Sequence, residues 1–247
     1  VADMSTLKVD PESGKQKPDY RWNDEELTEQ VYLNHLAGTQ SIGVQPCNEN
    51  SDARFGVVDV DPKNYTDFDK KFFIDIIQNY NLPLIPVLSK SGGLHLYLFM
   101  SEFVPAVLIR SFLSNLLPLF KLKPDCEIFP KQTQLTKDNE TGQLNKGNFI
   151  NLPYFKKSER VAINIDGTAF TFNQFIEVVE SNTTTPEKLK TITEGIEQKD
   201  LEGVDAEFDD GPPCLAHLSK IMRNPGFDGK DRFMYNYHVF VKMKYGD

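Results

Sequence analysis

Two acidic residues, Asp59 and Asp61, end an apolar run that is typical of a β-strand. In a strand, residues i and i+2 point to the same face about 6.6 Å apart, so the two carboxylates lie side by side. A buried pair of like charges is costly unless a positive group neutralises it, and carboxylate oxygens suit hard divalent cations. The pair therefore predicts a metal site. The alternative is that the strand ends here and both acids are solvated.

Two other stretches carry groups that bind phosphate or metal. In SKSGGLHLY, His95 follows a glycine turn, where backbone amides approach a phosphate closely and an imidazole can bond its oxygens. A purely structural histidine is the alternative. In EIFPKQ, Glu127 adds a third acid and Lys131 adds a positive charge for a phosphate, unless that lysine is simply solvated.

These residues need strands and helices to position them. The apolar spacing predicts an amphipathic helix over 67–80 and a hairpin over 82–100 with its turn at 91–93. A helix opens at Asn23 as N-cap, and others open at Pro105 and Pro186. Short strands are expected in three further places: around 41–44, in the DVD stretch and in CEIF. The segment NFINLPYF is expected to return to the core.

The composition is that of an ordinary globular protein, with 39% hydrophobic and 26% charged residues in a chain of 247. The three cysteines form no CxxC or Cys/His cluster, so we expect reduced thiols in a cytoplasmic protein rather than disulfides or structural zinc. No apolar stretch approaches the roughly 18 residues of a membrane span. A net charge of −9 argues against a uniformly basic nucleic-acid-binding surface.

Five motifs in one order resemble a known family. RFGVVDVD, SKSGGLHLYLF, EIFPKQ, GNFINLPYF and the later GPPCL are similar to the catalytic domain of archaeo-eukaryotic primases, in particular the primase-polymerases of phages, plasmids and mobile elements. The resemblance covers roughly Val31 to Phe155. It implies an α+β fold, in which an RRM-like antiparallel sheet and a smaller α/β module enclose the active-site cleft, followed by a C-terminal helical segment.

The resemblance also implies a function and roles for individual residues. The function is template-directed nucleotidyl transfer that makes primers on single-stranded DNA from NTPs or dNTPs. Asp59, Asp61 and Glu127 become the acids that hold two divalent ions, Mg²⁺ or Mn²⁺, and His95 becomes a triphosphate ligand. Further nucleotide contacts are expected from Ser89, Lys90, Ser91, Gly92, Gly93, Lys131, Gln132, Asn148 and Asn151.

The glycine turn departs from the family pattern. Many relatives have a serine two residues before the histidine, and here that position is Gly93. We therefore expect Ser91, Ser89 or the amides of Gly92 and Gly93 to take over the phosphate contact, with Lys90 as a further cation.

The chain is expected to have four parts. These are a polar tail (1–20), the catalytic core (21–182), a helix with an acidic linker (183–211) and a helical segment (212–247). The last part has a local excess of basic residues, so Arg223, Lys230 and Arg232 are candidate template contacts. A solvated amphipathic face is the alternative. We also expect the chain to belong to a longer replication protein with a helicase-like domain.

Two other functions account for part of the sequence. A metal-dependent glycosyltransferase would use the DxD pair, but it gives no reason for SGGLHLY or EIFPKQ. A non-catalytic nucleic-acid-binding replication module is the other alternative.

Overall fold

The computed structural model describes residues 2–9, 16–22, 27–65, 67–137, 142, 144–145, 147–156, 158–196, 238–240 and 242. The chain divides into two compact units, Val1–Leu189 and Lys190–Asp247. The first unit has a mixed α+β fold, as expected, and holds the predicted metal-binding acids. Most of the second unit, including nearly all of the predicted helical segment 212–247, lies outside the described residues.

The central element is a four-stranded antiparallel sheet with strand order β5-β6-β4-β7. Its strands are β4 (Asp52–Val60), β5 (Leu84–Leu88), β6 (Leu94–Pro105) and β7 (Glu127–Phe129). β5 and β6 pair directly through the SKSGG turn, so the predicted hairpin is confirmed. The strand order places β4 in the interior, between β6 and β7.

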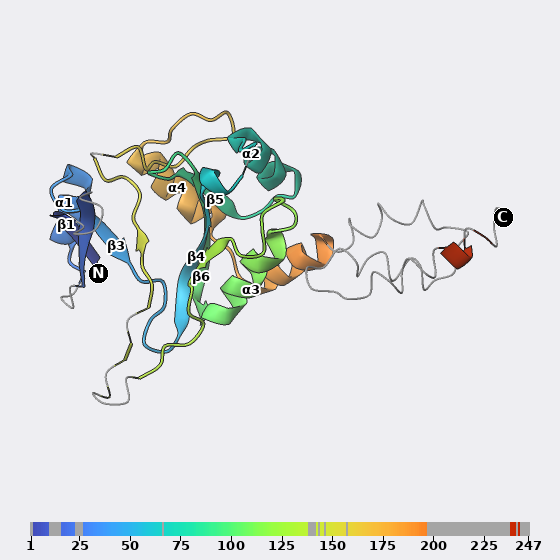
Figure 1. Cartoon of the computed structure of the whole chain (residues 1–247), viewed down its shortest axis with the longest axis horizontal. Helices are drawn as coiled ribbons and strands as arrows, with labels where there is room; N and C mark the ends of the chain where they lie inside the picture. Colours follow the sequence, from blue (N-terminus) through green and yellow to red (C-terminus); the bar gives the residue numbers. More distant parts are fainter. Residues whose placement is uncertain are drawn as a thin grey trace. The chain divides into compact units, whose positions relative to one another are not determined.

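Helices cover one face of this sheet. α2 (Lys70–Asn79) and α3 (Ala106–Leu116) lie on the same side in Figure 1. Gly56 of β4 marks the closest approach, because a Cβ at this position would contact Ile109 and Leu113 of α3. The absence of a side chain there lets α3 pack directly against the strand that carries Asp59.

The opposite face of the sheet carries both a buried hydrophobic cluster and the acidic residues. Along β4, alternate residues point to opposite faces, so Val57 and Asp59 share this face. Val57 packs in a buried cluster with Tyr97, Phe129, Ile150 of β8 (Ile150–Asn151) and Phe175 of α4 (Phe172–Asn182). The face is therefore apolar in the middle of β4 and acidic at its end.

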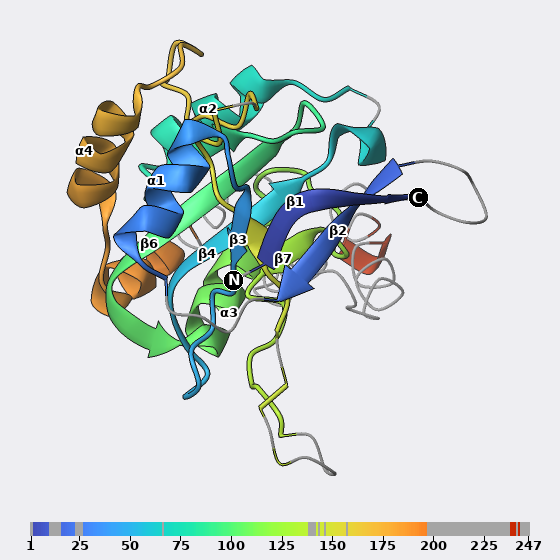
Figure 2. The same cartoon turned by 90° about the vertical axis from the view of Figure 1, so that its left-hand side faces the viewer.

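The second sheet has the order β2-β1-β3-β8 and contains two strands that the sequence did not predict. β1 (Ala2–Val9) and β2 (Gln16–Trp22) form an antiparallel hairpin where we expected a polar tail (Figure 2). Their sequences mix charged and polar residues without an apolar face, so the pattern gave no strand signal. The strand predicted at 41–44 is β3 (Ile42–Val44).

The helices mostly follow the sequence pattern, apart from the first. α1 (Glu29–Ala37) has Thr28 at its N-cap, so the expected start at Asn23 is corrected; it ends at Gly38, as predicted. Of the apolar residues that indicated this helix, Val31 and Leu36 lie within it and Leu27 lies before it, so the capping-box pattern upstream misplaced its beginning. A further helix covers 186–196, where Pro186 indicated one. No helix among the described residues is long and apolar enough to cross a bilayer.

Candidate active site

Three of the predicted site residues lie in one row across the four-stranded sheet. Asp59 of β4 is paired with His95 of β6 on one side and with Glu127 of β7 on the other. Directly opposed residues of antiparallel strands point to the same face, and Asp61 follows two residues after Asp59. The structure thus brings together three acids and a histidine that lie far apart in the sequence.

Each acid has its own neighbouring donor. The Asp59 Oδ1 lies 3.3 Å from the Nε2 of His95, a side chain that is only 10% exposed. Asp61 is the N-cap of η1 (Pro62–Asn64), and its Oδ1 accepts a hydrogen bond of 3.1 Å from the Lys63 amide. The Glu127 Oε1 lies 2.8 Å from the Nζ of Lys131.

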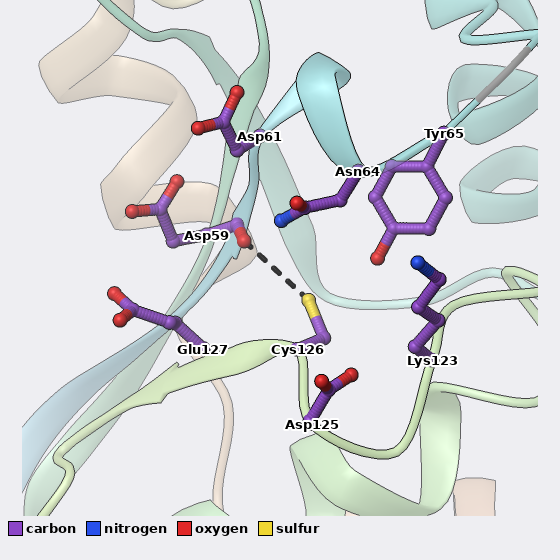
Figure 3. A pocket seen from close by; sticks show the side chains of 8 residues that line it. All are labelled: Asp59, Asp61, Asn64, Tyr65, Lys123, Asp125, Cys126 and Glu127. Carbon is purple, nitrogen blue, oxygen red and sulfur yellow. Dashed lines mark hydrogen bonds between the residues drawn. The ribbon is translucent and has the colours of Figure 1, made fainter.

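The three acids help to line a cavity of about 280 Å³. Its lining residues are Asp59, Asp61, Asn64, Tyr65, Lys123, Asp125, Cys126 and Glu127. In Figure 3 the carboxylates of Asp59, Asp61 and Glu127 all point to one side, whereas Asn64, Tyr65 and Lys123 lie on the other. The cavity therefore has an acidic wall, formed by Asp59, Asp61 and Glu127. We call the other side, with Asn64, Tyr65, Lys123 and Cys126, the loop wall.

The acidic wall fits divalent metal ions in donor chemistry. Three carboxylates offer the hard oxygen ligands that Mg²⁺ and Mn²⁺ prefer. The Cα atoms of directly opposed residues such as Asp59 and Glu127 lie about 4.5–5.5 Å apart, so side-chain rotation is needed to bring both carboxylates to one ion. In the conformation observed, no group of three acidic, histidine or cysteine side chains among the described residues is arranged to hold an ion. Metal binding by this wall thus remains a prediction.

The loop wall contains functional candidates that sequence reasoning missed. The Cys126 Sγ donates to the main-chain carbonyl of Asp59 at 3.4 Å, and the Lys123 Nζ lies 6.0 Å from the ring centroid of Tyr65. Burial raises the pKa of Tyr65 to about 12 and that of Cys126 to about 11, so both groups are neutral at physiological pH. No motif marks these residues. The sequence signal for them is weak: Tyr65 lies shortly after the DVD motif, and Cys126 lies directly before EIFPKQ.

The SKSGG turn satisfies its own hydrogen-bonding groups. The buried Ser89 accepts from the Gly93 amide at 3.1 Å, and its hydroxyl lies 2.9 Å from that of Ser91. The Gly92 amide donates to the Ser89 carbonyl at 3.1 Å. Both glycine amides that we expected to face a phosphate are therefore engaged within the turn, while Lys90 is exposed.

The geometry at Gly93 explains the departure from the family pattern. A Cβ at this position would collide with the Val60 carbonyl oxygen and would lie 2.7 Å from the Cδ of Pro62. A serine therefore does not fit here with the present backbone. Gly93 allows the turn to pack against the end of β4, beside Asp61.

Three amide side chains that we expected to contact the nucleotide, those of Gln132, Asn148 and Asn151, do not line the cavity. Gln132 and Asn148 bond to each other through their side chains, and the Asn148 amide donates to the Gln132 Oε1 at 2.9 Å. Asn151 accepts from the Tyr97 hydroxyl through its main-chain carbonyl at 3.3 Å, and its buried Oδ1 has no hydrogen-bond partner among the described residues. The first two join the ends of the loop at 133–147. The structure does not bring these three residues to the acidic wall.

The candidate template contacts cannot be placed. Arg223, Lys230 and Arg232 all lie outside the described residues. Their role therefore stays a prediction based on the local excess of basic residues.

Comparison with known proteins agrees with the geometry. The family model described as the archaeo-eukaryotic primase domain of TOTE conflict systems matches residues 12–192. This range contains the acidic wall, His95 and the SKSGG turn. A search of curated proteins found no match. The chain therefore belongs to the archaeo-eukaryotic primase family, in the branch associated with TOTE conflict systems.

Proposed function

We propose that the protein is a primase-polymerase, which joins NTPs or dNTPs on a single-stranded DNA template. The observation that carries the proposal is the placement of Asp59, Asp61 and Glu127 at one cavity, within a domain of the primase family. These three carboxylates supply acidic oxygens for the divalent ions that nucleotidyl transfer needs. The family match gives the glycosyltransferase alternative no support.

Asp59, Asp61 and Glu127 are the residues that would hold two ions, Mg²⁺ or Mn²⁺. When bound, such ions neutralise nucleotide phosphates and favour ionisation of an attacking hydroxyl. The protein contributes the positions of the ligands. Asp59 is fixed by the antiparallel pairing of β4 with both neighbours, and the Cys126 thiol holds its main-chain carbonyl.

His95 is proposed to act on the nucleotide from a nearly buried position. Its contact with the Asp59 Oδ1 orients that carboxylate, and its location after the glycine turn supports the expected contact with the triphosphate. Lys131 and Lys90 are the proposed positive charges for phosphate. Gln132, Asn148 and Asn151 remain proposed nucleotide or template contacts, which would require movement from the arrangement observed.

The test is a primer-synthesis assay with Mn²⁺, labelled NTPs or dNTPs and single-stranded DNA. The wild type should form labelled products only with template, and Asp59→Asn should abolish them. Asp52→Asn is the matched control, because Asp52 lies at the other end of the same strand and does not line the cavity. DNA binding without any product would instead support a non-catalytic nucleic-acid-binding module.

A further inference from the structure

One of the three acids already has a full positive charge against it. The Lys131 ammonium lies 2.8 Å from the Glu127 Oε1, and it also lies 5.1 Å from the ring centroid of Phe129. Lys131 thus folds back over Phe129 to reach the acid four residues earlier in the chain. The contact occupies one of the two carboxylate oxygens of Glu127 and places a positive charge where a metal ion would bind.

The ion pair is placed for easy exchange. The Glu127 side chain is 56% exposed and that of Lys131 is 30% exposed. Ion pairs between exposed side chains contribute little to stability, so a divalent cation can displace the ammonium at small cost. The displaced ammonium stays tethered close to the acidic wall, because its backbone follows directly after β7.

A displaced lysine needs a new anionic partner. An incoming nucleotide brings several phosphate charges to the same place, and a lysine ammonium binds phosphate well. Metal alone has to break the Glu127–Lys131 pair, whereas metal together with a triphosphate replaces that pair by another. The energetic consequence is a coupling between the two ligands.

We propose that Lys131 competes with a divalent ion for Glu127 and, once displaced, binds the triphosphate, so that nucleotide strengthens metal binding through this lysine. The inference rests on the proposed function and adds a role that Lys131 performs before any chemistry occurs. It predicts opposite effects of one substitution: removal of the ammonium improves binding of metal alone and weakens binding of nucleotide.

Lys123 is the matched control. It lines the same cavity, but its Nζ lies over the Tyr65 ring and not against Glu127. Lys123→Met and Lys131→Met each remove one positive charge near the acids, so the general electrostatic effect on Mn²⁺ binding should be similar in the two variants. Only the second substitution removes the competing contact.

The experiment measures Mn²⁺ binding by electron paramagnetic resonance, without DNA, with and without a non-hydrolysable nucleoside triphosphate. Lys131→Met should bind Mn²⁺ about two- to fivefold more tightly than wild type without nucleotide, the range expected for loss of an exposed ion pair. Nucleotide should then increase its Mn²⁺ affinity less than in wild type. Lys131→Arg should restore the coupling, and circular dichroism checks that each variant is folded.

Two results would overturn the proposal. One is that Lys131→Met binds Mn²⁺ no more tightly than Lys123→Met does. The other is that it retains the full effect of nucleotide. The same measurement on Asp59→Asn separates this failure from failure of the proposed function. If Mn²⁺ binding to the wild type does not depend on Asp59, both proposals fall. If it depends on Asp59 but shows no effect of Lys131, only the proposal about Lys131 falls.

Discussion

The acidic wall and the SKSGG turn meet at the end of β4 but differ in how their polar groups are used. Asp59, Asp61 and Glu127 carry charges that face a cavity, and each carboxylate has a donor beside it. In the turn, the amides of Gly92 and Gly93 are bonded within the turn itself. The difference suggests that side chains at the strand ends perform the chemistry, while the turn fixes the start of β6 and thereby His95.

The largest effect should come from the acidic wall. Asp59→Asn or Asp61→Asn should lower the rate of nucleotide joining by at least about a hundredfold, the scale for losing one essential electrostatic group in an active site. The thermal midpoint should stay the same or rise, because a like-charge repulsion is relieved. The Cys126 bond to the Asp59 main chain does not depend on the carboxylate, so the fold should persist. A variant that retains wild-type rates would show that the acids are not the site.

Cys126 sharpens the comparison, because it lies beside the acids and yet is neutral. Burial, with a contribution from Asp59 and other nearby acids, raises its pKa from 9.0 to about 11, which favours the thiol. At pH 8 the thiolate fraction is then about a hundredfold below that of a thiol with a pKa of 9. Alkylation by iodoacetamide, followed at Cys126 by mass spectrometry, should be correspondingly slow and should accelerate as pH rises toward 11.

The same measurement reports on the acidic wall. Asp59→Asn removes a negative charge that disfavours the thiolate, so the pKa of Cys126 should fall and alkylation at pH 8 should become faster. Asp52→Asn should leave the rate unchanged. Rapid alkylation of wild-type Cys126 at pH 8 would contradict the raised pKa of this partly buried thiol.

His95 connects the two regions, since it follows the turn and contacts Asp59. His95→Ala should weaken nucleotide binding about ten- to a hundredfold, the cost of losing one hydrogen bond to a charged group, and should leave single-stranded DNA binding unchanged. His95→Gln retains a donor on the side chain and should recover part of the loss. Equal losses for nucleotide and DNA, measured by fluorescence titration, would refute a specific role at the triphosphate.

The smallest effect should be structural and confined to the turn. Gly93→Ala forces a Cβ against the Val60 carbonyl, and overpacking of this kind costs about 1–3 kcal/mol in the free energy of unfolding. Gly92→Ala meets no neighbouring atom but has a φ of +84°, so it should cost about 1 kcal/mol. Urea denaturation measures both. Stability equal to wild type for Gly93→Ala would mean that the turn is not packed against β4.

The sequence predicted the parts of the fold that have a strong apolar pattern. The two apolar runs of β5 and β6 and the glycine turn between them specified the hairpin, and the helical spacing of Phe72, Phe73 and Ile76 specified α2. β1 and β2 were missed because their residues follow no clear apolar pattern, and β1 also pairs with the distant β3 through its backbone. Local pattern contains no information of that kind.

The acidic half of the site was predictable, and the loop half was not. Asp59, Asp61 and Glu127 belong to motifs whose order identifies the family, and the antiparallel register then places Asp59 opposite Glu127. Tyr65 and Lys123 come from separate loops that meet only in the folded chain. The turn was predicted in position but not in use, because a sequence does not reveal that the Ser89 hydroxyl accepts the Gly93 amide.

The central claim is that the acidic wall binds the ions for nucleotidyl transfer. Anomalous diffraction from crystals grown with Mn²⁺ and a non-hydrolysable nucleoside triphosphate tests it most directly. The account predicts manganese peaks within coordination distance of the Asp59, Asp61 and Glu127 carboxylates, with the Lys131 ammonium turned from Glu127 to the triphosphate. Nucleotide bound in the crystal with manganese absent from these three carboxylates would contradict it.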